Sequence, residues 1–113
     1  MKFLNNLDKY YSNTCLINEN KKTISYNDLL SDHEKISKDL KSRSLIFTLS
    51  SNHIDFITSY VSFLKKGLVQ VLLNSDIKKD YLQNLISKYL PEYIFLPTSR
   101  VTEFKNCEII LNF

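Results

Sequence analysis

His53 and Asp55 are the two residues whose types and spacing come closest to chemistry in this sequence. They follow the apolar run 45–49 and begin an amphipathic stretch, so they stand just past the carboxyl end of a predicted strand. Open parallel sheets usually bind their ligands at that end. A structural interpretation competes with this one: Asp55 and Asn52 form a helix-capping pair, and a histidine in a first helical turn is commonly just exposed. The structural interpretation is favoured.

We interpret His33, Cys15 and Cys107 as structural side chains and not as functional ones. His33 lies at the edge of the apolar side of a predicted helix, where a structural histidine is favoured over a catalytic one. Cys15 and Cys107 fall in predicted apolar strands, where a reduced thiol behaves as a small hydrophobic group. There is no CxxC motif, and His33 and His53 have no ligand-like spacing, so we expect no metal site. No residue is assigned as catalytic, cofactor-binding or metal-binding.

Gly67 is the single glycine of the chain. The sequence therefore contains no glycine-rich phosphate-binding loop, neither a GxGxxG motif nor a Walker motif. Gly67 follows Lys65 and Lys66, which suit the negative end of a helix dipole. It is placed to adopt the left-handed conformation that ends many helices.

The predicted fold is built around a strand–helix–strand unit. Runs 45–49 and 68–73 are short, apolar and rich in β-forming residues, and an amphipathic run ending at Lys66 separates them. A connection of this length joins parallel strands through a right-handed crossover. We expect 45–49, 68–73, 93–96 and 108–111 to be inner strands of the sheet, because near-continuous apolar strands need cover on both faces.

The other predicted elements complete an α/β fold. They are a short helix at 3–11 with Phe3, Leu7, Tyr10 and Tyr11 inward, a hairpin of 15–17 and 23–25, a helix at 26–41 begun by Ser25 and Asp28, and strands 93–96 and 108–111. A third helix, capped by Ser75 or Asp76, runs to Tyr89 and ends before Pro91. Its buried side chains are Tyr81 (or Ile77), Leu82, Leu85, Ile86 and Tyr89. Residues 98–107 are assigned to a loop, with one helical turn as the alternative for part of it. The predicted fold class is a mostly parallel sheet with helices on both faces, preceded by the short helix and the hairpin.

Composition indicates one soluble globular domain. The chain has 113 residues, 43% of them hydrophobic, and a net charge of +3 from lysines scattered among acids. Scattered lysines favour a solvated surface over a nucleic-acid interface. No apolar run approaches the ~20 residues of a membrane span, and the N-terminus lacks a signal-peptide core. We therefore expect a cytoplasmic protein with neither nucleic acid nor membrane as a partner.

The residues at the joints resemble the N-terminal segment of the adenylate-forming superfamily, which includes acyl- and aryl-CoA synthetases, adenylation domains and luciferase-type enzymes. The matching passages are Cys15-Leu16-Ile17, Ser25-Tyr26-Asn27-Asp28-Leu29, residues 45–57, residues 64–75, and residues 82–96. The resemblance covers the chain from about residue 12 onward. It departs from the family at Leu72 and Ser50, where proline is usual, and at residues 42–44, where Gly-Asp is usual.

The resemblance implies a fragment of an ATP-dependent ligase that makes an acyl-adenylate and transfers the acyl group to a CoA or carrier-protein thiol. In that family the ATP loop, the magnesium motif and the catalytic lysine lie beyond these residues, so the parent would need ATP and Mg while this chain alone would be inactive. His53 and Asn74 would lie at most near the substrate cleft. The implied partner is the remainder of the synthetase, and exposed apolar surface predicts a homodimer of the isolated chain. The alternative is a free-standing, non-catalytic α/β interaction or regulatory module.

Overall fold

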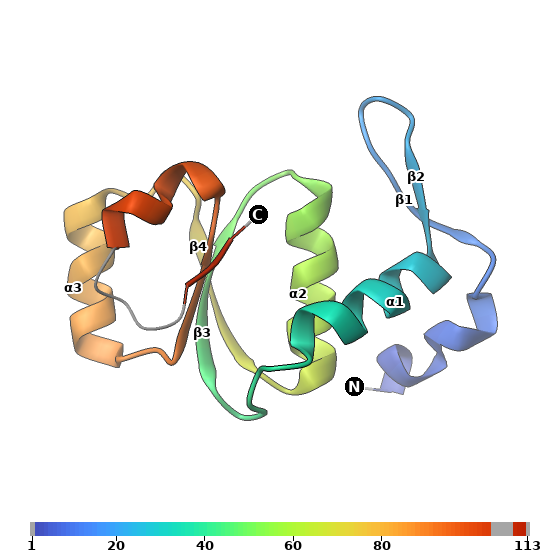
Figure 1. Cartoon of the computed structure of the whole chain (residues 1–113), viewed down its shortest axis with the longest axis horizontal. Helices are drawn as coiled ribbons and strands as arrows, with labels where there is room; N and C mark the ends of the chain where they lie inside the picture. Colours follow the sequence, from blue (N-terminus) through green and yellow to red (C-terminus); the bar gives the residue numbers. More distant parts are fainter. Residues whose placement is uncertain (1, 105–109, 113) are drawn as a thin grey trace. The chain divides into compact units, whose positions relative to one another are not determined.

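The computed structural model describes residues 2–104 and 110–112, shown in Figure 1. The chain forms two compact units, one of residues 1–42 and 52–67 and the other of residues 43–51 and 68–113. The first unit holds the N-terminal elements and the second holds the main sheet. Among the described residues, no helix is long and apolar enough to cross a membrane.

A parallel sheet forms the second unit. It consists of β3 (Leu45–Ser50), β4 (Val69–Asn74), β5 (Tyr93–Leu96) and β6 (Ile110–Asn112) in the order β4-β3-β5-β6. Every neighbouring pair is parallel, which confirms the α/β class and the parallel pairing predicted for 45–49 and 68–73. The first two residues of the predicted strand 108–111 lie outside the described residues.

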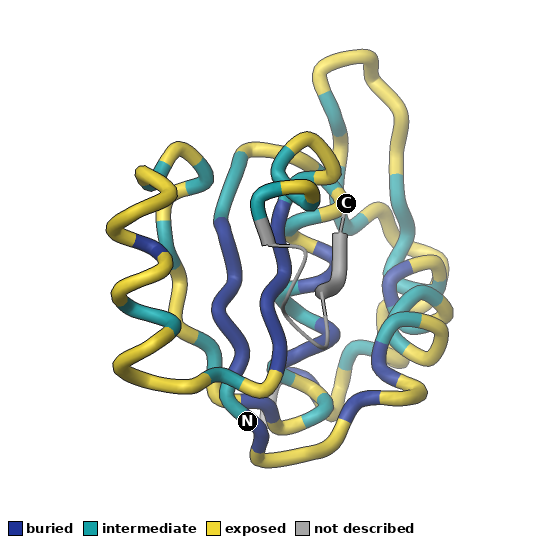
Figure 2. Tube along the Cα trace, turned by 60° about the vertical axis from the view of Figure 1, so that its left-hand side comes forward, coloured by how far each residue is buried: buried dark blue, intermediate teal, exposed yellow. Residues whose placement is uncertain are grey.

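The prediction that 68–73 and 108–111 are inner strands is wrong, because β4 and β6 are the two outer strands of the described sheet. The two central strands β3 and β5 are buried along most of their length, as Figure 2 shows. By contrast, β4 is an edge strand of the described sheet, and the side chains of Val69 and Leu72 are 57% and 50% exposed. An edge strand has a neighbour on one side only, so an apolar sequence does not by itself bury it.

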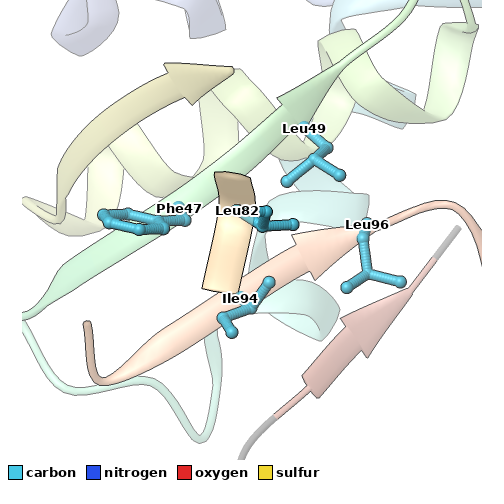
Figure 3. Close-up of a cluster of buried hydrophobic side chains, with 5 residues drawn as sticks. All are labelled: Phe47, Leu49, Leu82, Ile94 and Leu96. Atoms are coloured by element: carbon cyan, nitrogen blue, oxygen red, sulfur yellow. The ribbon is translucent and has the colours of Figure 1, made fainter. Parts of the chain in front are cut away.

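The core of the second unit lies between the sheet and α3 (Lys79–Tyr89). Figure 3 shows Leu82 of α3 among side chains of β3 and β5. The buried cluster consists of Phe47, Leu49, Leu82, Ile94 and Leu96, with Ile77, Leu85 and Ile86 packed against it. Leu82, Leu85 and Ile86 confirm the inward face predicted for the helix, and Ile77 packs against the same cluster from the turn before α3. Tyr81 and Tyr89 are instead 61% and 53% exposed, which corrects their predicted burial.

The predicted start of the third helix is also wrong. The helix begins after Lys78, which makes no side-chain capping bond, and not at Ser75 or Asp76. The cause is Asn74, whose Oδ1 accepts from the Asp76 N–H at 2.8 Å and whose carbonyl accepts from the Ile77 N–H at 3.0 Å. These bonds close a turn and use the N–H groups that a helix start would need. At the other end Leu90, next to Pro91, leaves the right-handed helical region as predicted and adopts φ +50°.

The first unit begins with the 3₁₀ helix η1 (Lys2–Tyr10), followed by the antiparallel hairpin of β1 (Thr14–Ile17) and β2 (Thr23–Ser25). In η1 Leu4 is buried and Leu7 is half-buried, while Tyr10 and Tyr11 are exposed, which corrects their predicted inward position. The burial of Phe3 lies outside the described residues. The predicted loop 98–107 contains a second 3₁₀ helix, η2 (Thr98–Phe104), and Cys107 lies outside the described residues.

Helix α1 (Tyr26–Ser37) starts as predicted and ends early. Ser25 and Asp28 form a reciprocal capping box, and the hydrogen bonds from Ser25 hold the pKa of the Asp28 carboxyl below its usual value. The predicted end at residue 41 is wrong. The Ser37 hydroxyl donates to the His33 carbonyl at 2.7 Å and the Leu40 N–H turns back to the Ser37 carbonyl, so the chain tightens there.

Helix α2 (Ile54–Lys66) ends at Gly67 as predicted. Gly67 has φ +85° and ψ +28°, and its N–H donates to the Leu64 carbonyl at 3.1 Å. Lys65 and Lys66 lie in the last turn. Only glycine adopts this left-handed conformation without a steric penalty, so the one glycine of the chain is used as a helix terminator.

Candidate functional site

The structure brings His53 and Asp55 together at the start of α2. His53 is the N-cap residue, and its Nδ1 accepts from the Asp55 N–H at 3.2 Å. The same nitrogen lies 3.5 Å from Asp55 Oδ2, and both side chains are more than half exposed. The predicted cap at Asn52 is therefore wrong by one residue, since the imidazole of His53 reaches the N–H group that Asn52 was expected to satisfy.

An open pocket of about 280 Å³ adjoins this helix start. It lies between the hairpin and the first turn of α2, and it is lined by Leu16, Ile17, Asn18, Glu19, Asn20, Asn52, His53, Ile54 and Ile57. Its polar groups are amides, one carboxylate and one imidazole that already caps a helix. None of these lining residues is a serine, threonine or cysteine that His53 could activate, so a nucleophile–base pair cannot be formed from them.

At the carboxyl end of the sheet, local bonds occupy the polar groups. The Ser75 N–H donates to the Ser50 carbonyl at 3.1 Å, which ties the ends of β3 and β4 together. The Ser50 hydroxyl donates to the Leu73 carbonyl at 3.0 Å, and Asn74 closes its own turn. Asn74 thus has a structural role at the position where the sequence suggested proximity to substrate.

Arg100 was missed by the sequence reasoning. Its Nη1 donates to the Ser75 carbonyl at 2.9 Å, and its Nε lies 2.6 Å from Glu103 Oε2. The guanidinium therefore joins η2 to the turn after β4. The available signal was the spacing of Arg100 and Glu103, which are three residues apart and are neighbours if the segment is helical.

His33 takes part in a polar cluster that joins α1 and α2. Its Nδ1 lies 2.9 Å from the Ser62 hydroxyl of α2 and 3.3 Å from the Ser37 hydroxyl. Ser62 is fully buried, and Ser37 is nearly so. The i, i+4 spacing of His33 and Ser37 in the sequence indicates a shared helix face, while the contact with Ser62 depends on the tertiary structure.

His33 gives the first unit a predicted pH dependence. Burial, then Lys65 and Lys66 of α2, hold the pKa of His33 below 6.5, against the opposing effects of Ser62 and Glu34. The unfolded chain then binds more protons than the folded one as pH falls through 6.5, so the free energy of unfolding should decrease there and level off below the folded pKa. Urea unfolding followed by circular dichroism at a series of pH values measures this decrease.

Two variants test whether His33 causes this decrease in the free energy of unfolding. His33→Asn should lose the decrease, and His53→Gln should keep it because His53 is exposed at a helix start. A decrease that persisted in His33→Asn would contradict the assignment to His33.

The arrangement of the described side chains does not favour a metal site. Within residues 2–104 and 110–112, no group of three or more histidine, cysteine, aspartate or glutamate side chains could hold an ion. Cys15 is a free thiol, and burial raises its pKa despite a hydrogen bond with Tyr26. A raised pKa lowers the thiolate fraction, which disfavours both metal binding and nucleophilic attack.

Comparison with solved structures identifies the fold. MatB from Rhodopseudomonas palustris, in its ATP-bound structure, matches with a TM-score of 0.82 and 13% identity over 96% of this chain. A luciferase-like enzyme from the mealworm Zophobas morio matches with a TM-score of 0.78 and 19% identity over 97% of this chain. The chain has the N-terminal fold of the adenylate-forming enzymes.

The same fold is found in a structure of an N-terminal subdomain. The N-terminal subdomain of NpsA from Klebsiella oxytoca matches with a TM-score of 0.78 and 15% identity over 98% of this chain. The chain spans only 24% of the MatB chain, 29% of the luciferase-like chain and 30% of the NpsA subdomain chain. No protein-family model and no curated protein matches the sequence.

Proposed function

We propose that residues 1–113 are the N-terminal scaffold of a larger ligase that activates an acyl or aryl acid with ATP. The parent would form an acyl-adenylate, release pyrophosphate and transfer the acyl group to a CoA or carrier-protein thiol. The observation that supports this most strongly is the match to ATP-bound MatB over 96% of this chain and 24% of MatB. Such coverage is expected if these residues are one folded part of a longer enzyme.

The described residues do not provide the groups that would hold ATP and magnesium. We therefore derive no reaction step that uses ATP or magnesium bound to this chain. A triphosphate is held by backbone N–H groups turned inward by a glycine-rich loop, with a lysine or a metal opposite. Here the one glycine ends α2, and the polar groups at the ends of β3 and β4 bond to each other. We propose that the parent binds ATP and magnesium through segments beyond residue 113.

In this proposal the contribution of the chain is positional. The buried cluster around Leu82 fixes α3 against β3 and β5. Arg100 and Asn74 then fix the turns at the carboxyl end of the sheet, where parallel sheets bind ligands. A segment that followed β6 would start at the outer strand of this sheet. The exposed side chains of β4 are the surface on which the rest of the parent, or a second copy of the isolated chain, would pack.

The reading frame after codon 113 tests the proposal. We expect it to encode a Ser/Thr/Gly-rich loop ending in Pro-Lys, followed by the remaining ligase motifs. A stop codon directly after Phe113, with no ligase sequence downstream, would contradict the proposal and favour the free-standing interaction module.

A further inference from the structure

A second pocket of the first unit, of about 400 Å³, has a different composition from the pocket at His53. It lies beside α1 and includes the end of α2 and the turn after η1. Its lining residues are Tyr11, Asn27, Leu30, Ser31, His33, Glu34 and Lys65. Most of the polar groups here can donate hydrogen bonds, and Glu34 is the only acid among them.

The His33 ring is hydrogen-bonded to both helices. Its Nδ1 lies within hydrogen-bond distance of the hydroxyls of Ser62 and Ser37, and the ring also bonds to the main chain of Ser62. Ser37 gives its proton to the His33 carbonyl at 2.7 Å, whereas the hydroxyl of Ser62 is closer to Nδ1, at 2.9 Å, than to that carbonyl, at 3.4 Å. Either the Ser62 hydroxyl donates to Nδ1, or it donates to the carbonyl and accepts from Nδ1. In the protonated ring both nitrogens carry a proton, so the imidazolium is a cationic donor in both arrangements.

The donors are held in place by the surrounding structure. Ser62 and Ser37 fix the imidazole between α1 and α2. The Asn27 N–H donates to the Tyr11 carbonyl at 2.9 Å, which keeps those two lining residues adjacent. Lys65 makes no ion pair with an acid in the described part of the chain, and its charge contributes to the low pKa of His33. A positive charge that disfavours a neighbouring imidazolium is a charge that an anion would neutralise.

We propose that this pocket binds a small oxyanion, with the Lys65 ammonium and the protonated His33 ring as its principal charged donors. Sulfate, phosphate and carboxylate share the chemistry that such donors recognise, namely several acceptor oxygens around a negative charge. Asn27, Ser31 and Tyr11 would supply neutral hydrogen bonds from the walls. The proposal is independent of the ligase assignment, because it uses only residues of the first unit.

Titration of the full 113-residue chain with sodium sulfate, followed by NMR at constant ionic strength set with sodium chloride, tests the proposal. We expect saturable shifts of the amides of α1 and of the end of α2, and an upward shift of the His33 pKa. Sodium acetate and sodium phosphate form the comparison arms, which separate recognition of a carboxylate from recognition of a tetrahedral anion. Shifts that rise linearly without saturation in all three arms would overturn the proposal.

Two substitutions sharpen the test. Lys65→Gln should weaken sulfate binding by about two- to fivefold, the effect of one exposed charge. The matched control Lys66→Gln removes a neighbouring charge that does not line the pocket and should change the affinity less. His33→Asn keeps a polar group near the Nδ1 position and removes the charge of the protonated ring, so it should also weaken binding. Equal affinity in Lys65→Gln and in the unmodified chain would overturn the proposal.

Discussion

Leu82→Ala should lower the free energy of unfolding by about 2–5 kcal/mol, the range observed when a buried leucine is truncated. Leu82 is fully buried, and it contacts the cluster formed by β3 and β5. Truncation removes apolar contacts and leaves a cavity, because strands paired on both sides cannot move inward to fill the space. Urea unfolding followed by circular dichroism measures the loss.

Tyr81→Ala is the matched control. Tyr81 precedes Leu82 in the same helix and is 61% exposed, so its truncation tests helix propensity and surface effects without opening the core. We expect a change within about 0.5 kcal/mol. Equal losses in the two variants would show that α3 does not pack on the sheet through Leu82.

Gly67→Val should destabilise the chain by about 1 kcal/mol or more. The φ angle of +85° is strained for any residue with a Cβ atom, and most of all for a β-branched one. Added bulk is not the cause, because a Cβ atom at this position would meet no other atom within 4 Å. The penalty is therefore conformational, and thermal unfolding of the variant should show it as a lower midpoint.

Gly67→Asn provides the control for that explanation. Asparagine tolerates the left-handed region better than other residues with a side chain, so its penalty should be smaller than that of valine. Equal stability of Gly67→Val and the unmodified chain would contradict the assignment of Gly67 as the terminator of α2.

Local sequence signals predicted those parts of the fold that local forces determine. The capping box of Ser25 and Asp28 requires two side chains three residues apart, and the structure contains it. Strand β5 has the predicted bounds, because an apolar run between polar residues and Pro97 leaves little choice. Gly67 ends α2 in the left-handed conformation, as its place directly after the amphipathic run ending at Lys66 predicted.

Errors arose where one polar group could form several alternative bonds. Asn74 competes for the N–H groups after β4, which delays α3 by about one turn, and Ser37 competes for the His33 carbonyl at the end of α1. The exposure of β4 could not be predicted from its residues, because an apolar strand looks the same at the edge and at the centre of a sheet.

The candidate sites were predictable to different degrees. The sequence predicted that His53 and Asp55 lie at the start of a helix, because both come directly after β3. It assigned the cap of that helix to Asn52, whereas the capping residue is His53. The contact of His33 with Ser62 joins residues 29 positions apart, on two different helices. No periodicity within one helix reports such a contact, so the His33 pocket required the structure.

The most direct test of the scaffold assignment is acid-dependent exchange of pyrophosphate into ATP by the complete reading frame. We predict exchange with at least one acyl or aryl acid for the complete protein, and none for residues 1–113 alone. The complete protein carrying Leu82→Ala should lose exchange activity at a lower temperature than the unmodified protein. Exchange catalysed by the isolated chain, or its absence from a folded complete protein across a broad panel of acids, would contradict the assignment.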